Sequence, residues 1–368
     1  MKIGLIKEIK TEEYRVGLTP QSASEYVKNG HTVLVEKSAG EGSGFSDDEY
    51  IKQGCTIEPD KRKIYDTADM IIKVKEPLEE EYDLYHEDQL LYTYLHLAAD
   101  KPQAEFLVNK KVNSIAYETV QESNGSLPLL KPMSEIAGRL SVQEGAKYLE
   151  KAFGGRGVLL GGVPGIRRGK VTILGGGIVG TNACKIAVGM GAEVTILDIS
   201  SERLTYLDDI FGTSITTLYS NQTNIEQCIS EADLVIGAVL IPGAAAPKLV
   251  KRSQLKLMQK GAVLVDVAID QGGCFETAKP TFHSNPTYIV DDVVHYCVAN
   301  MPGVVALSST YALTSVTNRY GLQIANKGLE KAAEDSNAIK LGINTYKGKL
   351  TNEPVAVALD MQYTPYGE

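Results

Sequence analysis

A glycine-rich segment near the middle of the chain has the spacing of a nucleotide-binding loop. Gly175, Gly177 and Gly180 form the pattern G-x-G-x-x-G directly after the apolar run 171–174. The first glycine permits a tight turn, the second lets the backbone approach a pyrophosphate, and the third lets a helix pack closely on a strand. The amides at the start of that helix would face the phosphates, where the helix dipole favours negative charge. The segment therefore predicts a dinucleotide site.

An acidic residue completes this pattern. Asp198 lies at the end of the next predicted strand, 193–197. A carboxylate there would bind the adenosine ribose hydroxyls and repel a 2′-phosphate, which favours NAD over NADP as the cofactor. Arg203 follows shortly after and leaves this preference open, because a guanidinium could also bind a 2′-phosphate. The alternative for Arg203 is a solvated charge on a helix.

Three polar residues in the first third of the chain fall where predicted strands end. Arg15 lies in the loop after the first strand, Lys75 directly follows 70–74, and His96 directly follows 90–95. Ligands of open α/β sheets bind beyond the carboxyl ends of the strands, so we expect these side chains at one edge. A guanidinium can bind a carboxylate, an ammonium can polarise a carbonyl, and an imidazole can exchange a proton. Together they predict a site for a small acid, although each alone could be a solvated charge or a structural histidine.

The same rule selects residues in the second half of the chain. Beside the glycine-rich loop it points to Ser220, Val239, Leu240, Asp270 and Asn300. Asp270 lies between an apolar strand and a pair of glycines, which is more specific than a random surface charge. If the two halves of the chain face each other across a cleft, Asp270 and His96 would approach one substrate from opposite sides.

Short β-branched apolar runs alternate with helical stretches, which favours parallel α/β sheets. Strands are expected at 2–6, 32–36, 70–74, 90–95 and 112–117, and then at 171–174, 193–197, 215–218, 234–238, 262–268 and 287–290. Thr19, Pro20 and Gly30 mark the two ends of a helix between the first two strands, and Ser134 is expected to cap another helix. The prediction is an α/β fold with two Rossmann-like, doubly wound domains.

Residues 1–130 are predicted to form the first part of a substrate domain and 131–307 a nucleotide-binding domain. Residues 308–368 read as helices and are too short for a domain, so we expect them to pack back on the first part. The substrate domain would then be discontinuous in sequence.

Composition excludes several classes of protein. The chain has 368 residues, with 37 basic and 46 acidic side chains and a net charge of −9, and it contains no basic stripe typical of a nucleic-acid binder. Its five cysteines are scattered without a CxxC, which excludes a disulfide framework and a zinc ribbon. We interpret His295 and Cys297 as packing residues and expect no metal site.

The first residues lack the apolar core of a signal peptide, and the longest uncharged stretch, 293–318, is too polar for a membrane helix. We therefore expect a cytoplasmic protein.

Several strings resemble one known family over essentially the whole chain. The run GLIKEIKTEEYRVGLTP at 4–20 is similar to the N-terminal signature of alanine dehydrogenases and of the NAD-binding part of pyridine nucleotide transhydrogenases. The similarity continues through KPMSEIAGR at 131–139, GGRGVLLGGVPG at 154–165 and HYCVANMPG at 295–303. Ile6 stands where the family usually has proline and Gly17 where it usually has alanine, and neither departure touches a polar residue.

The resemblance to alanine dehydrogenases implies reversible oxidative deamination of L-alanine to pyruvate and ammonia with NAD. It implies that Arg15 and Lys75 hold the substrate carboxylate and carbonyl oxygen, that His96 is the general acid and base, and that Asp270 is its catalytic partner. It also implies a homohexamer and a cofactor site lined by Ser134, Ile178, Val179, Asp198, Arg203, Ser220, Val239, Leu240, Val267, Ala268, Ile269, Asp270, Val298, Ala299, Asn300 and Met301.

Three alternatives share parts of this pattern. A transhydrogenase alpha subunit would only bind NAD(H), but that family lacks an acid at the position of Asp270. A non-catalytic NAD-binding protein would give no reason for Arg15, Lys75 and His96 to occur together. Saccharopine-forming dehydrogenases have the same architecture and act on a larger substrate. The range of small amino acids accepted stays open at this stage.

Overall fold

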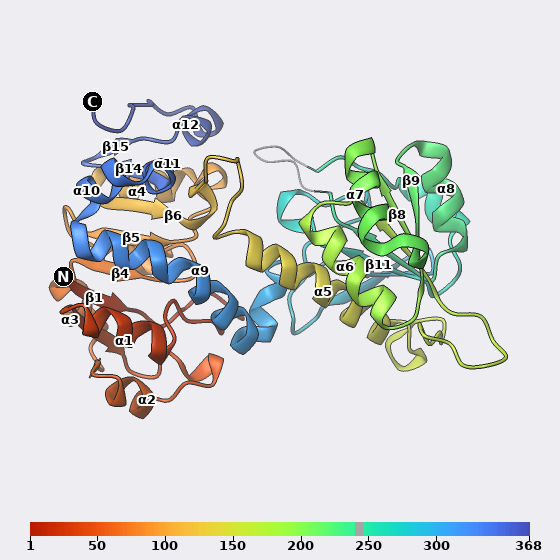
Figure 1. Ribbon diagram of the computed structural model, residues 1–368, viewed down its shortest axis with the longest axis horizontal. Coiled ribbons are helices and arrows are strands. Elements are labelled where there is room, and N and C mark those ends of the chain that lie inside the picture. The colour runs from red at the N-terminus through yellow and green to blue at the C-terminus, as the bar shows by residue number, and fades with distance from the viewer. Residues whose placement is uncertain (240–245) are drawn as a thin grey trace. The chain divides into compact units, whose positions relative to one another are not determined.

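The computed structural model describes residues 1–239 and 246–368 and divides into two compact units (Figure 1). Unit 1 comprises Met1–Met133 and Gly303–Glu368, and unit 2 comprises Ser134–Pro302. Leu240, one of the predicted cofactor residues, lies outside the described residues. No helix in the described part of the chain is long and apolar enough to cross a membrane.

Unit 1 is built on an eight-stranded sheet with the order β15-β14-β6-β5-β4-β1-β2-β3. Its strands are β1 (Lys2–Leu5), β2 (Thr32–Glu36), β3 (Thr56–Glu58), β4 (Met70–Ile72), β5 (Leu90–Thr93), β6 (Asn113–Ala116), β14 (Ile343–Tyr346) and β15 (Lys349–Leu350). The first six are parallel, and their order from one edge is 3-2-1-4-5-6, the doubly wound arrangement. The carboxyl ends of β1, β4, β5 and β6 therefore lie side by side.

The helices of unit 1 come from both ends of the chain. They are α1 (Pro20–Lys28), α2 (Asp47–Lys52), α3 (Lys61–Thr67), α4 (Lys101–Asn109), α9 (Ala306–Lys327), α10 (Leu329–Asp335), α11 (Asn337–Gly342) and α12 (Glu353–Leu359). The signals for α1 are confirmed, because the Thr19 side chain accepts a hydrogen bond from the Ser22 amide and Gly30 is left-handed. The helix α9 packs closely on α1, since a Cβ at Gly321 would lie 2.1 Å from the Tyr26 hydroxyl.

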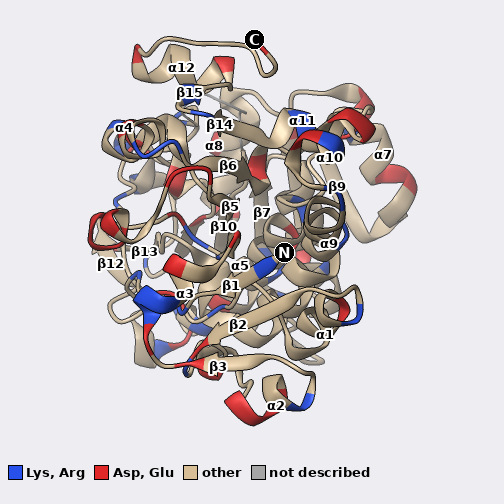
Figure 2. Cartoon of the chain, turned by 90° about the vertical axis from the view of Figure 1, so that its left-hand side faces the viewer, with Lys and Arg blue, Asp and Glu red and all other residues tan. Residues whose placement is uncertain are grey.

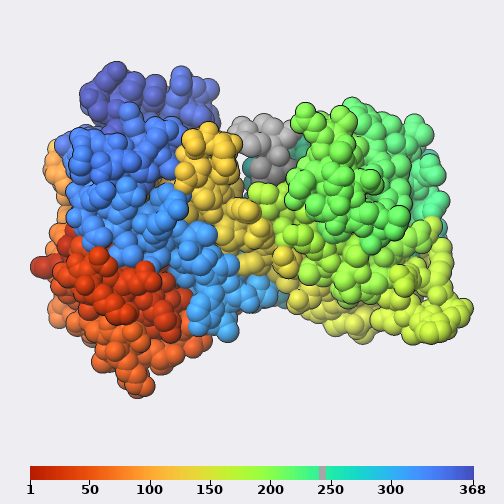
Figure 3. Space-filling model, in the orientation of Figure 1, coloured from red at the N-terminus to blue at the C-terminus, as the bar shows by residue number. Residues whose placement is uncertain are grey.

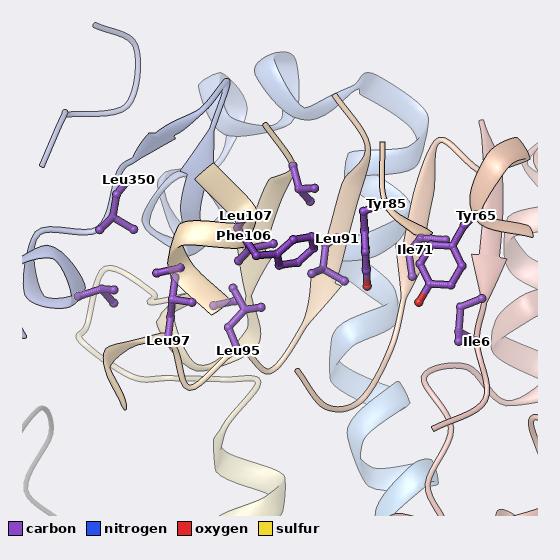
Figure 4. Close-up of a cluster of buried hydrophobic side chains, with 14 of the residues drawn as sticks. Ile6, Tyr65, Ile71, Tyr85, Leu91, Leu95, Leu97, Phe106, Leu107 and Leu350 are labelled. Atoms are coloured by element: carbon purple, nitrogen blue, oxygen red, sulfur yellow. The ribbon is translucent and has the colours of Figure 1, made fainter. Parts of the chain in front are cut away.

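The C-terminal segment is part of the unit 1 core. Leu350 and the buried face of α12 join the cluster formed by Phe106, Leu107 and Leu91 (Figure 4). The surface view shows the blue C-terminal segment lying against the red N-terminal segment (Figure 3). Reading residues 308–368 as helices alone was wrong, because β14 pairs with β6 and β15 pairs with β14. These strands are too short to give a clear sequence pattern.

Unit 2 contains a seven-stranded sheet with the order β12-β13-β11-β10-β7-β8-β9. Its strands are β7 (Lys170–Leu174), β8 (Glu193–Asp198), β9 (Ile215–Tyr219), β10 (Leu234–Gly237), β11 (Val263–Asp266), β12 (Thr287–Val290) and β13 (Val293–Tyr296). All are parallel except β12, which runs antiparallel to β13, and β7 to β11 with β13 repeat the order 3-2-1-4-5-6. The strand order reverses between β7 and β10, where ligands of such sheets bind.

Four long helices accompany this sheet: α5 (Lys131–Tyr148), α6 (Ile178–Gly189), α7 (Ser201–Phe211) and α8 (Gln222–Glu231). The helix α5 begins at Lys131, so the prediction that Ser134 caps it was wrong. Pro132 fits the first turn, where its missing N–H is not needed, and the helix therefore starts before the serine.

Acidic and basic segments are interspersed on the face shown in Figure 2.

Removal of the Leu350 side chain should destabilise unit 1. Leu350 is 2% exposed and lies in the core, so Leu350→Ala should lower the free energy of unfolding by about 2–5 kcal/mol. Leu341→Ala is the matched control, because Leu341 is 42% exposed, and it should cost about 0.5 kcal/mol or less. Urea unfolding of the two variants measures both values. Equal, small losses would show that the C-terminal segment does not contribute to the core.

Candidate active site

Arg15 lies in the loop that follows β1 and is held by a neighbouring carboxylate. Its Nε donates to Glu13 Oε1 at 2.7 Å, its terminal nitrogen lies 2.5 Å from Glu13 Oε2, and another nitrogen contacts the Met133 sulfur at 3.1 Å. Arg15 is buried, and burial would lower its pKa, but Glu13 outweighs this and the pKa is raised. The guanidinium is therefore charged and its orientation is set by a two-point contact.

Lys75 lies just beyond β4, where a carboxylate holds its backbone. Glu8, from the loop after β1, accepts hydrogen bonds from the Val74 amide at 2.6 Å and the Lys75 amide at 3.2 Å. These bonds join the carboxyl ends of β1 and β4. Glu8 is buried, and burial raises its pKa despite the opposing charge of Lys73, whose Nζ lies 3.3 Å away.

Lys73 is fully buried between two carboxylates. Its Nζ lies 3.3 Å from Glu8 and 3.0 Å from Glu81, and the Tyr65 hydroxyl donates to Glu81 at 3.1 Å. Burial would lower the pKa of Lys73, but the two carboxylates outweigh it and the pKa is raised. Removing one member of such a group leaves a buried charge without its partner. The group therefore holds the segment that leads from β4 to Lys75.

His96 lies beyond β5 and next to Lys75. Its Nε2 lies 3.5 Å from Lys75 Nζ, and its ring lies nearly parallel to Tyr94 with centroids 6.0 Å apart. Its backbone is left-handed, with φ 49° and ψ 35°. Glu118, beyond β6, accepts the His96 amide at 2.6 Å and the Leu95 amide at 3.0 Å. The expected approach of Lys75 and His96 is therefore present in the structure.

Glu76 adds a negative charge beside these groups. It pairs with Lys10, and Lys75 and His96 also act on its charge. Burial would raise the pKa of Glu76, but these three basic groups outweigh it and the pKa is lowered. The strand-end edge of unit 1 thus holds ionised groups of both signs.

The glycine-rich loop of unit 2 has the backbone that its spacing predicts. Gly175 has φ +103°, a Cβ at Gly180 would lie 1.8 Å from the Gly175 carbonyl oxygen, and a Cβ at Gly177 would meet nothing within 4 Å. The loop thus needs glycine for its turn and its packing, and it leaves open space at the start of α6. Ile178 and Val179 form the first residues of that helix. A pyrophosphate fits this position because the helix amides face it without an obstructing side chain.

Asp198 connects the end of β8 to the glycine loop. Its carboxylate accepts hydrogen bonds from the Gly176 amide at 2.6 Å and the Ser200 amide at 2.9 Å. A carboxylate has about four acceptor positions, so it retains capacity for ribose hydroxyls. Arg203 donates to the Gly176 carbonyl and to Thr181, so it contacts the loop and is not a solvated helix charge.

Asp270 lies in a short 3₁₀ turn, Ile269–Gln271, that a buried aspartate holds. Asp266, at the end of β11, accepts the amides of Ala268 at 3.1 Å, Cys274 at 2.8 Å and Phe275 at 3.3 Å. Burial raises its pKa from 3.8 to about 6 even though these amides lower it. Val267 and Ala268 directly precede this turn, and Ile269 is its first residue.

Most of the remaining predicted cofactor residues of unit 2 also lie where its strands end. Ser220 follows β9 and donates its amide to the Asp198 carbonyl at 2.9 Å, and Val239 follows β10. Val298, Ala299, Asn300 and Met301 follow β13, with Asn300 left-handed at φ 60°. Ser134 lies in the first turns of α5.

His295 and Cys297 have packing contacts, as interpreted from the sequence. His295 is buried, with Nδ1 3.0 Å from the Val293 carbonyl and Nε2 2.7 Å from Thr277 Oγ1. Cys297 Sγ lies 3.4 Å from the Tyr288 hydroxyl, and burial raises the pKa of its thiol to about 12. Over residues 1–239 and 246–368 no group of three or more His, Cys, Asp or Glu side chains is arranged to hold a metal ion.

Sequence reasoning missed the carboxylates that hold the functional loops. Glu8 and Glu118 lie a few residues beyond predicted strands, so the rule that selected Lys75 and His96 could also have selected them. Asp266 ends its strand inside an apolar run. These acids bind backbone amides, a contact that has no local signal in the sequence.

Models of two family domains match this chain. Residues 4–137 match the alanine dehydrogenase/PNT N-terminal domain, and residues 141–353 match the alanine dehydrogenase/PNT C-terminal domain. The chain belongs to the alanine dehydrogenase/PNT family. The resemblance stated from the sequence motifs is thereby confirmed.

Individual alanine dehydrogenases match along the full chain. An alanine dehydrogenase of Methanococcus maripaludis is 57% identical over 366 residues, covering 99% of this chain and 98% of the relative. Alanine dehydrogenase 2 of Staphylococcus aureus is 55% identical over 364 residues, with 99% and 98% covered. A solved structure of an L-alanine dehydrogenase has a TM-score of 0.95 and 53% identity and covers 98% of this chain and 99% of its own. The predicted α/β fold is confirmed.

A transhydrogenase from Sinorhizobium meliloti has the same fold. Its structure has a TM-score of 0.82 at 22% identity and covers 96% of this chain and 99% of its own. At this identity the likeness concerns the fold alone.

The raised pKa of Asp266 predicts a pH-dependent stability. The folded protein retains the proton up to about pH 6 and the unfolded chain releases it near pH 3.8, so the contribution of Asp266 falls as pH rises between these values. A shift of about 2 pH units corresponds to about 3 kcal/mol. The free energy of unfolding of wild type minus that of Asp266→Asn should therefore rise by about 2–3 kcal/mol from pH 7 to pH 4. Urea unfolding at both pH values tests this, and a constant difference would contradict it.

Proposed function

We propose that this protein is an NAD-dependent alanine dehydrogenase that catalyses the reversible oxidative deamination of L-alanine to pyruvate and ammonia. The observation that carries the proposal is identity of 55–57% to alanine dehydrogenases over 99% of the chain. The oxidoreductase class and the NAD dependence of the family follow from the same relationship. The adjacent ammonium and imidazole of Lys75 and His96 provide the chemistry that this reaction requires.

The glycine loop and Asp198 would hold NAD. Open space at Gly177 and the amides at the start of α6 suit a pyrophosphate, and the Asp198 carboxylate suits the adenosine ribose. Ser220, Val239 and the turn with Val267, Ala268 and Ile269 are assigned to the same cofactor. When bound, NAD supplies the acceptor for the hydride that leaves the α-carbon of alanine.

Arg15 and Lys75 are assigned to the substrate. The charged Arg15 guanidinium, oriented by Glu13, would bind the carboxylate of alanine or pyruvate. Lys75 would bind the oxygen that becomes the pyruvate carbonyl. In the oxidative direction these two cations hold the iminium acid that forms after the α-carbon loses its hydride. Fixing the substrate at two points lowers the entropic cost of reaching the reactive geometry.

His96 is assigned the proton transfers. Water adds to the iminium carbon while His96 accepts a proton from the water, which gives a carbinolamine. His96 then returns that proton to the nitrogen, and the C–N bond breaks as the hydroxyl proton passes to the departing ammonia, so that pyruvate and ammonium result. An imidazole suits both transfers because its ordinary pKa lies close to neutral. Asp270 is assigned to stabilise the cationic nitrogen and the carbinolamine.

Two further assignments concern the assembly of the protein and its location. A homohexamer is the assembly that the family resemblance implies, and the cytoplasm is the location expected from the composition. Both stay predictions for this chain.

The purified protein should form NADH from NAD and L-alanine without a partner or a membrane. Formation of NADH, followed by its absorbance at alkaline pH, measures this.

In the same assay His96→Ala should lower kcat by about 100-fold or more, while NAD binding is retained. His86→Ala is the matched control. His86 is exposed and its Nδ1 lies 2.9 Å from the carbonyl oxygen of the neighbouring Glu87, so the rate of this variant should be unchanged. A folded wild-type protein without turnover would contradict the proposed function.

Replacement of Asp198 should relax the choice of cofactor. The Ala variant removes the carboxylate that would repel a 2′-phosphate, so the ratio of kcat/KM for NAD to that for NADP should fall by about 10-fold or more. Steady-state kinetics with both cofactors gives this ratio. An unchanged ratio in a folded, active variant would reject the role of Asp198 in cofactor choice.

A further inference from the structure

The backbone of His96 has a conformation that side chains rarely adopt. With φ 49° and ψ 35°, it is left-handed, a region that a residue with a Cβ occupies only when the surroundings hold it there. This conformation sets the direction in which the imidazole leaves the end of β5. The position of the ring beside Lys75 therefore depends on what holds the backbone.

Glu118 holds that backbone. Its Oε1 accepts the His96 amide at 2.6 Å and the Leu95 amide at 3.0 Å, and its Oε2 lies 3.3 Å from the Leu95 nitrogen. Two successive amides that converge on one anion form a small concave binding site for negative charge. Here the anion comes from the same chain.

The register of the sheet brings these groups together. Thr93 on β5 is opposite Ala116 on β6, and the strands run parallel. Two residues further along, Leu95 and Glu118 leave the sheet at the same level, so the side chain reaches the amides without crossing another element. Glu118 lies in the 3₁₀ turn Tyr117–Thr119, directly after the strand.

We propose that Glu118 is a positioning residue that orients the His96 imidazole through its backbone. The inference deepens the proposed function and rests on it, because it gives Glu118 a role only if His96 transfers protons. Glu118 provides acceptor oxygens at the correct distance for two amides. The role of Glu118 is this contact with the backbone, whereas charge beside the ring also comes from Lys75 and Glu76.

Two conservative variants separate an acceptor role from a charge role. Glu118→Gln loses the charge but keeps an acceptor oxygen at the same reach, so kcat should stay within about fivefold of wild type. Glu118→Asp keeps the charge but withdraws the oxygens by one methylene, so kcat should fall by about 10- to 100-fold. In both variants KM for alanine should change little, since Arg15 and Lys75 bind the substrate, and the Kd for NAD should be unchanged.

Combination with His96→Ala tests whether Glu118 acts through His96. In that background Glu118→Asp should lower the residual kcat by no more than about twofold, because the group it orients is gone. Glu122→Asp is the matched control for the same segment. Glu122 pairs with Arg319 at 3.0 Å and not with the His96 loop, so its variant should keep wild-type kcat.

The outcomes are distinguishable. If Glu118→Gln is impaired and Glu118→Asp is active, charge and not the acceptor contact is required, and the proposal is wrong. If Glu118→Asp lowers kcat equally with and without His96, Glu118 does not act through His96, and the proposal is again wrong. Failure of the wild-type protein to oxidise alanine would instead overturn the proposed function, and the role of Glu118 with it. Circular dichroism and the Tm of each variant establish that a rate change is not a loss of folding.

Discussion

Carboxylates that accept backbone amides set the geometry of both candidate sites. Glu8, Glu118, Asp198 and Asp266 each accept two or more amides in the loops beyond parallel strands. Hydrogen bonds to an ionised acceptor are shorter and stronger than neutral ones, and losing a partner of this kind typically costs about 1.5–3 kcal/mol. The loops that carry Lys75, His96 and Asp270 are therefore held by bonds that do not involve the functional side chains themselves. The backbones of these residues are thus fixed independently of their side chains.

The strand order explains why these loops meet. Both sheets contain the order 3-2-1-4-5-6, so the loops after the central parallel strands leave each sheet at one edge. In unit 1 this places Lys75 and His96, which are far apart in sequence, with Nζ and Nε2 3.5 Å apart. In unit 2 it places Asp198 and the glycine loop together through the Gly176 amide. The same architecture thus provides a site for a small acid in one unit and a site for a dinucleotide in the other.

Much of this arrangement could be predicted from the sequence, because strand ends and glycine spacing are local signals. The approach of Lys75 and His96 and the backbone of the glycine loop were expected on that basis. The start of α5 ahead of Ser134 was not, since Pro132 permits a helix start that competes with the serine. The strands β14 and β15 were missed because their pairing with β6 is decided by tertiary contacts over a few residues. The role of Glu118 depends on the register of β5 and β6, which the sequence does not show.

The central claim is that the strand-end side chains of unit 1 bind the substrate while the carboxylates hold their loops. A crystal structure of the protein with NADH and pyruvate tests this most directly. We expect the pyruvate carboxylate on Arg15, its carbonyl oxygen on Lys75 and the His96 imidazole within hydrogen-bond distance, with the bonds from Glu8 and Glu118 to the backbone amides retained. Pyruvate bound away from these three side chains, or bound there with those carboxylates turned away from the amides, would contradict the account.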